Sequence, residues 1–305
     1  MIWLGVNVAK AREVTFVNLT SHDIIIFVNG DKRVIKKSGT IARVSTKRMK
    51  DTLLDAYKLM QRYNLNRLVI VNDEYKPIGI ITSKDLVEFL LEDTSGRALD
   101  DVKVSEVMSK NPIQVAPTYP IPGVASLMLK NKISSIIVVN DDGKLAGIVT
   151  KTDLCRFYSQ FEGLNLVKDY MTSPVVTVRP YDSVFKAALL MMSKDISRLV
   201  VVERRKVVGI ITLTDLTLVA PLLKGLRGVP RRALRKLFTK GIAVTVADLM
   251  TSDPITIYEE EDLATAAKLM ITHSISGLPV LDIREELSGI VTKTDIVRAV
   301  SDMKK

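Results

Sequence analysis

The chain has 305 residues, of which 47% are hydrophobic and 26% are charged, and its 44 Lys and Arg residues against 34 Asp and Glu residues give a formal net charge of +10. This composition excludes wholesale disorder. No apolar run reaches the roughly 18 residues that span a bilayer, so we expect no membrane contact of that kind. The single cysteine, Cys155, cannot form an internal disulfide, which predicts a reducing, cytoplasmic location. The positive charge favours anionic partners without choosing between nucleotides, nucleic acid and acidic proteins.

Residues 1–40 form an extension that precedes any repeated pattern. Within it, residues 23–37 carry β-branched runs on either side of Asn29-Gly30, which is the turn sequence of a tight β-hairpin. Such a hairpin can cover an exposed sheet edge or contact a partner protein. The sequence favours neither role.

After this extension, one motif recurs four times along the chain. Each copy reads Gly-apolar-apolar-Thr at the close of a strand, with an aspartate three residues after the threonine. A methionine precedes each motif threonine by 21 or 22 residues. An internal repeat of this kind decides the architecture. The motif occupies residues 79–85, 147–153, 209–215 and 289–295.

Each repeat predicts a strand, a helix, two strands and a second helix. In the last repeat Leu263, Ala266, Ala267 and Met270 have the spacing of an amphipathic helix, and a hairpin follows them. A unit of this size buries little core by itself, so the units are expected to pair. We therefore predict an α/β (α+β) fold of four βαββα units. Their expected bounds are residues 41–95, 104–160, 167–222 and 246–303.

A basic insertion separates the third repeat from the fourth, over residues 223–243. Its apolar residues have helical spacing after Pro230, which predicts a short basic amphipathic linker helix. The helix can simply be solvated at a module seam, or it can contact ligand phosphates, an acidic partner or nucleic acid. No helix-turn-helix or zinc-finger pattern supports specific nucleic-acid recognition. The seven cations of the insertion are Lys224, Arg227, Arg231, Arg232, Arg235, Lys236 and Lys240.

These motifs resemble the CBS domain family. The resemblance rests on residues 278–282, Leu-Pro-Val-Leu-Asp, followed by the Gly289 motif, and on a Met-Thr or Met-Ser lead-in to each later repeat at Met108, Met171 and Met250. In this family two units form a Bateman module. Four units in one chain resemble the gamma subunit of AMP-activated protein kinase, which implies two modules associated as a flat disc.

The resemblance also implies a site for adenine nucleotides between paired units. A motif carboxylate can accept hydrogen bonds from both ribose hydroxyls, and a helix start favours phosphate. The implied ribose ligands are Asp85, Asp153, Asp215 and Asp295. The implied phosphate-side hydroxyls are those of Thr82, Thr150, Thr212 and Thr292. Arg67 and Arg198, just before a strand of the first and third repeats, are the expected phosphate cations.

Structural explanations exist for the same residues. A threonine three residues before an aspartate at a helix start is a capping box, and capping is compatible with ribose binding. It does not explain the glycine of the motif. The two arginines can also be solvated at strand edges. Lys84, Lys151 and Lys293 lie inside the motif, where helix-start lysines are usually solvated but can assist phosphate binding.

The sequence therefore predicts a non-enzymatic regulatory protein that senses AMP or ADP first and ATP next, with no required cofactor and no metal site. Its expected partners are the nucleotide, a regulated protein and a second copy of the chain. The second hypothesis is a nucleic-acid-associated protein that uses residues 224–240. The third is a sensor of S-adenosylmethionine or magnesium. No nucleophile, base and orienting group converge in the sequence, which argues against an enzyme.

Overall fold

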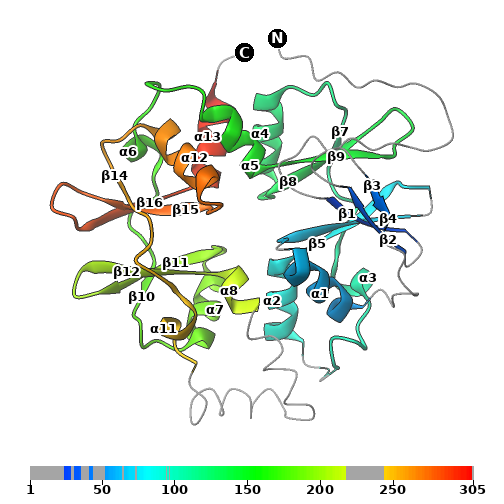
Figure 1. Ribbon diagram of the computed structural model, residues 1–305, viewed down its shortest axis with the longest axis horizontal. Helices are drawn as coiled ribbons and strands as arrows, with labels where there is room; N and C mark the ends of the chain where they lie inside the picture. Colours follow the sequence, from blue (N-terminus) through cyan, green and yellow to red (C-terminus); the bar gives the residue numbers. More distant parts are fainter. Residues whose placement is uncertain are drawn as a thin grey trace.

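The computed structural model describes residues 52–303 apart from 64, 73, 94, 96 and 218–243, together with the backbone of three strands between residues 24 and 43. Four repeats are visible, arranged around a common centre (Figure 1). The basic insertion, with the cations of residues 224–240, lies outside the described residues. Among the described residues, none of the helices has the length and apolar composition needed to cross a membrane.

The second repeat shows the plan that the third and fourth repeats share, whereas in the first repeat the strand parallel to the central strand comes from residues 24–28, before the expected start of that repeat. The central strand of the second repeat pairs in parallel with the short first strand and antiparallel with the third. The predicted order of strand, helix, strand, strand, helix is confirmed. The elements are β7 (Gln114–Val115), α4 (Ile121–Lys130), β8 (Ser135–Val139), β9 (Leu145–Thr150) and α5 (Lys151–Tyr158).

The third and fourth repeats repeat this plan, each behind a one-turn helix. The third contains α6 (Val167–Tyr170), β10 (Thr177–Val178), α7 (Val184–Ser193), β11 (Arg198–Glu203), β12 (Lys206–Thr212) and α8 (Leu213–Thr217). The fourth contains α11 (Val246–Leu249), β13 (Thr251–Ser252), β14 (Ile257–Tyr258), α12 (Leu263–Thr272), β15 (Gly277–Leu281), β16 (Leu287–Thr292) and α13 (Lys293–Asp302). The apolar face predicted for the helix after Asp262 is the buried face of α12.

The first repeat carries the N-terminal strands on its sheet. It contains α1 (Leu53–Tyr63), β4 (Arg67–Val71), β5 (Pro77–Thr82) and α2 (Ser83–Glu92). The added strands are β1 (Ile24–Val28), β2 (Asp31–Ile35) and β3 (Ile41–Arg43). β1 and β2 pair antiparallel where the Asn-Gly turn predicts a hairpin, and β1 lies parallel to β4. The hairpin therefore covers a sheet edge of the first repeat, which is one of the two roles that the sequence left open.

Consecutive repeats are joined by an exchange of their lead-in segments. The lead-in to the second repeat, α3 (Val104–Val107) and β6 (Ser109–Lys110), pairs with β5 of the first. β13, before the fourth repeat, pairs with β12 of the third. Thr172, before the third repeat, bridges to Ile290 of the fourth. The pairing of repeats one with two and three with four into two modules follows from these strands.

The exchange explains the glycine of the repeated motif. A Cβ atom at Gly79 would overlap the Sδ atom of Met108, and one at Gly209 would overlap the Sδ atom of Met250. Gly289 faces Met171 in the same way. Protein interiors leave no room for such an added group unless the neighbour moves. Packing of the lead-in methionine accounts for the glycine in these three repeats, so the glycine is not evidence for a ligand.

The two modules meet through their helices. α4 and α5 of the second repeat pack against α12 and α13 of the fourth, and their side chains share one hydrophobic core. α2 of the first repeat packs against α8 of the third. Figure 1 shows these helix pairs between the two halves of the molecule. The starts of all four motif helices are thereby turned toward the junction of the repeats.

Candidate functional site

Each motif aspartate caps its own helix. In every repeat one carboxylate oxygen accepts hydrogen bonds from the backbone N–H and the hydroxyl of the motif threonine, at 2.6 to 2.8 Å. The capping-box interpretation is confirmed. One oxygen of each carboxylate is left for other partners, and an ionised carboxylate offers about four acceptor positions in total. Capping therefore leaves room for the hydroxyls of a ligand.

The second carboxylate oxygen distinguishes the even repeats from the first. Arg156 lies 3.3 Å from Oδ1 of Asp153, and Arg298 lies 2.6 Å from Oδ1 of Asp295. Burial raises the pKa of Asp295, and its hydrogen bonds from Thr292 and the charge of Arg298 act against that shift. The first repeat has Glu88 at the position of these arginines. The carboxylates of the even repeats are thus more heavily engaged than that of the first.

The two predicted arginines cross from the odd repeats into the even ones. Arg67 donates from Nη1 to the carbonyl oxygen of Ser134 at 2.7 Å. Arg198 lies against Gly277, where an added Cβ atom would overlap its Nη1. Both side chains are half-buried, and burial lowers the pKa of each to about 10. The small residues of the second and fourth repeats thus make room for the arginine of the facing repeat.

Two motif lysines cross between the even repeats in a reciprocal pair. Lys151 donates to the hydroxyl of Thr294 at 2.7 Å, and Lys293 donates to that of Thr152 at 2.8 Å. Burial, then Arg198 and Arg67, lower the pKa of Lys151 to about 8. The pKa of Lys293 is lowered by burial and by the same arginines. Lysines at helix starts are usually solvated, but these two are half-buried at this seam.

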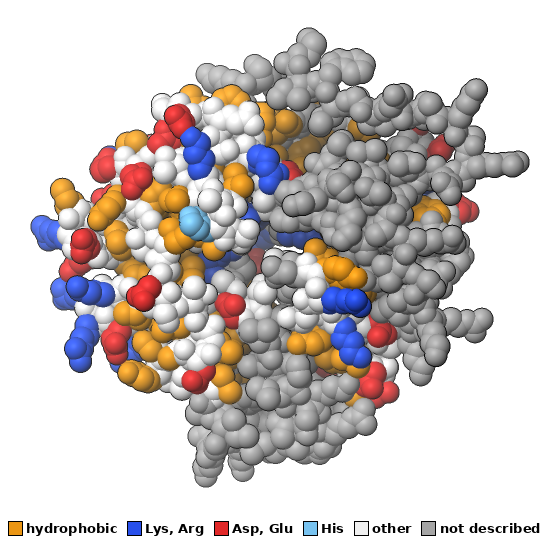
Figure 2. All heavy atoms as spheres, viewed as in Figure 1, with side chains coloured by type: hydrophobic (Ala, Val, Ile, Leu, Met, Phe, Trp, Pro, Cys, Tyr) orange, Lys and Arg blue, Asp and Glu red, His pale blue; other side chains and the backbone are white. Residues whose placement is uncertain are grey.

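We call these four side chains the central cation cluster: Arg67, Arg198, Lys151 and Lys293. Asp153 and Asp295 are the carboxylates that stabilise the charges of its arginines, and both are already bound by their caps and by Arg156 and Arg298. Figure 2 shows Lys and Arg side chains in a recess at the middle of one face. The two arginines lie close enough to lower the pKa of both lysines, and such a group of cations favours a bound anion.

The seam between the first and third repeats lacks this excess of charge. The positions of the two seam lysines are taken by Ser83 and Leu213, which are both buried. Lys84, one position later, is exposed and pairs with Asp195, while Thr214 donates to Asn66 at 3.1 Å. The four repeats are therefore alike in fold but unequal in electrostatics. The sequence contains a signal for this difference, because only the second and fourth repeats have a lysine at the first position of the motif helix.

Other chemistry finds little support around this cluster. Cys155 is fully buried, and burial raises the pKa of its thiol to about 12, so it packs in the core and is not a nucleophile. Within the part of the chain that the structure describes, no three His, Cys, Asp or Glu side chains come together as metal ligands would. The arrangement is suited to holding an anionic ligand by hydrogen bonds and charge.

Comparison with known proteins places this geometry among relatives. Residues 46–92, 104–160, 167–220 and 246–302 each match the CBS domain family. Protein MJ1225 of Methanocaldococcus jannaschii is 27% identical over 260 residues, which cover 81% of this chain and 91% of that protein. A 33.4 kDa protein of the ribosomal RNA operon of Thermofilum pendens is 26% identical over 272 residues, covering 83% of this chain and 86% of that one.

A solved structure agrees with the first of these matches. The crystal structure of MJ1225, described as a proposed archaeal homologue of γ-AMPK, superposes with a TM-score of 0.68 over 82% of this chain and 93% of that chain. A protein of Pyrococcus horikoshii, 22% identical, superposes with a TM-score of 0.56 over 77% of this chain and 91% of its own, and shows the same fold.

Proposed function

Because the chain belongs to the CBS domain family, with four repeats that match its profile, we propose that it is a non-enzymatic regulatory protein that binds adenine nucleotides. AMP and ADP are the first candidates and ATP is the next. The nucleotides occupy the clefts between paired repeats, and a partner protein reads the resulting change in shape.

The central cation cluster is the observation that carries this proposal. Four cationic side chains lie together, half-buried, while the nearby carboxylates are already engaged. The motif helices begin beside them, and a helix start adds its own attraction for phosphate. A nucleotide whose ribose hydroxyls meet a motif aspartate can extend its phosphates toward the cluster. The likeness to MJ1225, described as a proposed archaeal homologue of γ-AMPK, supports a regulatory role.

The cluster also supplies a mechanism for signalling. Without a ligand, repulsion among its cations opposes the packing of the second repeat against the fourth, while the shared core favours it. A bound phosphate reduces this repulsion. The ligand therefore stabilises an arrangement of the second and fourth repeats in which the cations lie closer together, relative to one in which they lie further apart. The shift is limited by the difference in ligand affinity between the two arrangements.

The charge distribution weighs against the third hypothesis. S-adenosylmethionine carries a sulfonium and magnesium is a cation, and neither gains from a group of positive side chains. The nucleic-acid hypothesis rests on residues 224–240, which lie outside the described residues. The nucleotide proposal is therefore the one that the described side chains support.

Calorimetric titration with AMP, ADP, ATP, adenosine and S-adenosylmethionine tests the proposal. We expect AMP, ADP and ATP each to bind more tightly than adenosine, which has no phosphate for the cluster to hold. Asp85→Asn, Asp153→Asn, Asp215→Asn and Asp295→Asn, made one at a time, are expected to remove binding steps at the occupied sites, with a loss of about tenfold to a hundredfold per site. If no nucleotide binds below roughly millimolar concentration, or if no aspartate variant weakens binding, the proposal fails.

The lowered pKa of Lys151 predicts opposite pH effects on binding and stability. Phosphate is fully ionised above pH 7, so loss of the Lys151 proton near pH 8 is expected to weaken ATP binding about tenfold between pH 7 and pH 9. Between about pH 8 and 10.5 the unfolded state holds the proton that the folded state has lost, so this lysine makes ligand-free stability rise with pH.

The control for this prediction is Lys151→Met, which keeps the length of the side chain and removes its charge. Both pH trends are expected to shrink in this variant, in ATP titrations and in thermal melts without ligand. Equal trends in the variant and the unmodified protein would show that other groups cause them.

A further inference from the structure

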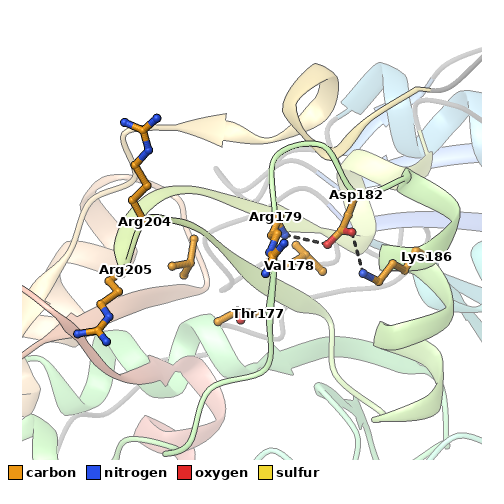
Figure 3. A pocket seen from close by; sticks show the side chains of 8 residues that line it. Thr177, Val178, Arg179, Asp182, Lys186, Arg204 and Arg205 are labelled. Carbon is orange, nitrogen blue, oxygen red and sulfur yellow. Dashed lines mark hydrogen bonds and ion pairs between the residues drawn. The ribbon is translucent and has the colours of Figure 1, made fainter.

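A basic groove lies on the third repeat, separate from the central cation cluster. It is formed by the end of β10, the start of α7 and the turn between β11 and β12, and it encloses about 470 Å³. Its charged residues are Arg179, Asp182, Lys186, Arg204 and Arg205 (Figure 3). Arg198, a member of the cluster, is the first residue of β11, and the turn follows the last residue of that strand. A strand rises about 3.3 Å per residue, so the turn lies roughly 20 Å from Arg198.

Part of the positive charge in this groove is not neutralised by a carboxylate. Lys186 pairs with Asp182 at 2.7 Å, and Asp182 also accepts the backbone N–H of Arg179 at 2.9 Å. The side chain of Arg205 is 86% exposed and lies 4.0 Å from Glu286. Arg204 is exposed and makes no hydrogen bond or ion pair with any residue that the structure describes. The groove therefore presents four cations, of which Lys186 is paired with Asp182 and Arg205 lies at the limit of ion-pair distance from Glu286.

The fold does not require these cations. At the positions equivalent to Arg179 and Lys186, the second repeat has Ala116 and Gly123 and the fourth has Tyr258 and Thr265. The β11–β12 hairpin is also unlike the others, since its turn has two residues between Glu203 and Lys206. Among the second, third and fourth repeats, the basic groove therefore occurs in the third alone.

The turn pays a conformational cost for its arginines. Arg204 and Arg205 have φ of 50° and 68°, the left-handed region. A two-residue hairpin turn of this kind strongly prefers Asn-Gly, because side chains such as arginine are strained there. Strain of this sort persists at places where the residues serve a function. Two arginines therefore occupy a turn whose backbone favours Asn-Gly.

We propose that this groove binds an extended acidic segment of a partner protein. In Figure 3 the side chains of Arg204 and Arg205 point to opposite sides of the turn, so a single compact phosphate does not meet both. Carboxylates on successive residues of an extended chain alternate between its two sides, which matches the two directions. Arginine forms paired hydrogen bonds with each carboxylate.

The test replaces the turn by the sequence that the backbone prefers. In the full chain, Arg204→Asn with Arg205→Gly is expected to raise Tm by about 2–4 °C. The same change is expected to weaken binding of a fluorescein-labelled peptide of ten consecutive glutamates, which has carboxylates on both sides when extended, at least tenfold at low salt. If the arginines served only the fold, the variant would be less stable. A variant that is more stable but binds the peptide more weakly shows that the arginines serve binding.

The matched control is Lys110→Gln with Lys130→Gln, which removes two exposed positive charges from the second repeat. It is expected to leave peptide binding within about twofold, as screening of distant charges predicts. Nucleotide titrations are expected to be unchanged in the turn variant, so this proposal and the nucleotide proposal fail independently. The assignment is wrong if the turn variant binds the peptide as tightly as the unmodified protein, or if the control variant loses as much affinity as the turn variant. It is also wrong if a twelve-nucleotide single-stranded DNA binds more tightly than the peptide and depends on the same two arginines.

Discussion

Replacing Arg67 and Arg198 together by glutamine is expected to weaken ATP binding about a hundredfold or more, with a smaller loss for AMP and almost none for adenosine. Each arginine lost removes a charge-assisted hydrogen bond to phosphate, worth about 1.5–3 kcal/mol. Burial already lowers the pKa of both guanidinium groups, so the folded protein gains nothing from their charge when no ligand is bound. Calorimetric titration of the three ligands measures the gradation.

This experiment is specific because the expected loss of affinity increases with the number of phosphates in the ligand. A variant that merely distorted the cleft would weaken adenosine as much as ATP. Lys110→Gln with Lys130→Gln again removes two charges elsewhere and is expected to leave all three affinities within about twofold. We also expect the unliganded double variant to unfold at the same temperature as the unmodified protein or higher. A fall in that temperature, with equal losses for all ligands, would mean that the arginines act through packing.

Replacing Asp295 by alanine is expected to destabilise the protein by about 2–4 kcal/mol, which urea unfolding measures. The side chain of Asp295 is 7% exposed, and its carboxylate accepts hydrogen bonds from the backbone N–H and the hydroxyl of Thr292 and from Arg298. Alanine leaves these donors without a partner in a buried place, and unsatisfied buried groups cost about 1–3 kcal/mol each. Asp85→Ala, whose carboxylate caps its helix without an arginine partner, is expected to cost about 1 kcal/mol.

Asparagine at position 295 separates hydrogen bonding from charge. Burial raises the pKa of Asp295, so its charge is a net cost at neutral pH, and Asp295→Asn is expected to lie within about 1 kcal/mol of the unmodified protein. A carboxyl group whose folded pKa is raised contributes stability that is present at low pH and lost as the pH rises through that pKa. The free energy of unfolding of the unmodified protein should therefore rise relative to that of the asparagine variant as the pH falls toward 4. Asparagine as damaging as alanine would show that the ion pair with Arg298 dominates.

Local patterns in the sequence were enough to predict the repeat and its elements. A helix such as α12 follows from apolar residues that recur every three or four positions, and the hairpin after it follows from β-branched residues and a turn. The capping of each motif helix is also local, because Thr292 and Asp295 lie three residues apart. These features depend on neighbours along the chain, so one sequence carries them.

The partners across the junction of repeats could not be predicted in this way. Arg67 meets Ser134 and Lys151 meets Thr294, pairs that are 67 and 143 residues apart. The sequence left open whether the lysines are solvated or assist phosphate binding, because nothing near them along the chain indicates that another helix covers them. The glycine of the motif looked like a ligand feature until Met108, Met171 and Met250 were found against it.

The sequence by itself determined the number of repeats, the order of their elements and the identity of the motif residues, since all of these follow from short-range patterns and from repetition. The tertiary structure decided which repeats face each other and therefore where charge collects. Packing of the second repeat against the fourth buries two lysines beside two arginines, while Lys84 at the other seam is exposed and pairs with Asp195. Electrostatic interaction depends on distance in space and on burial, and neither is written in the order of residues.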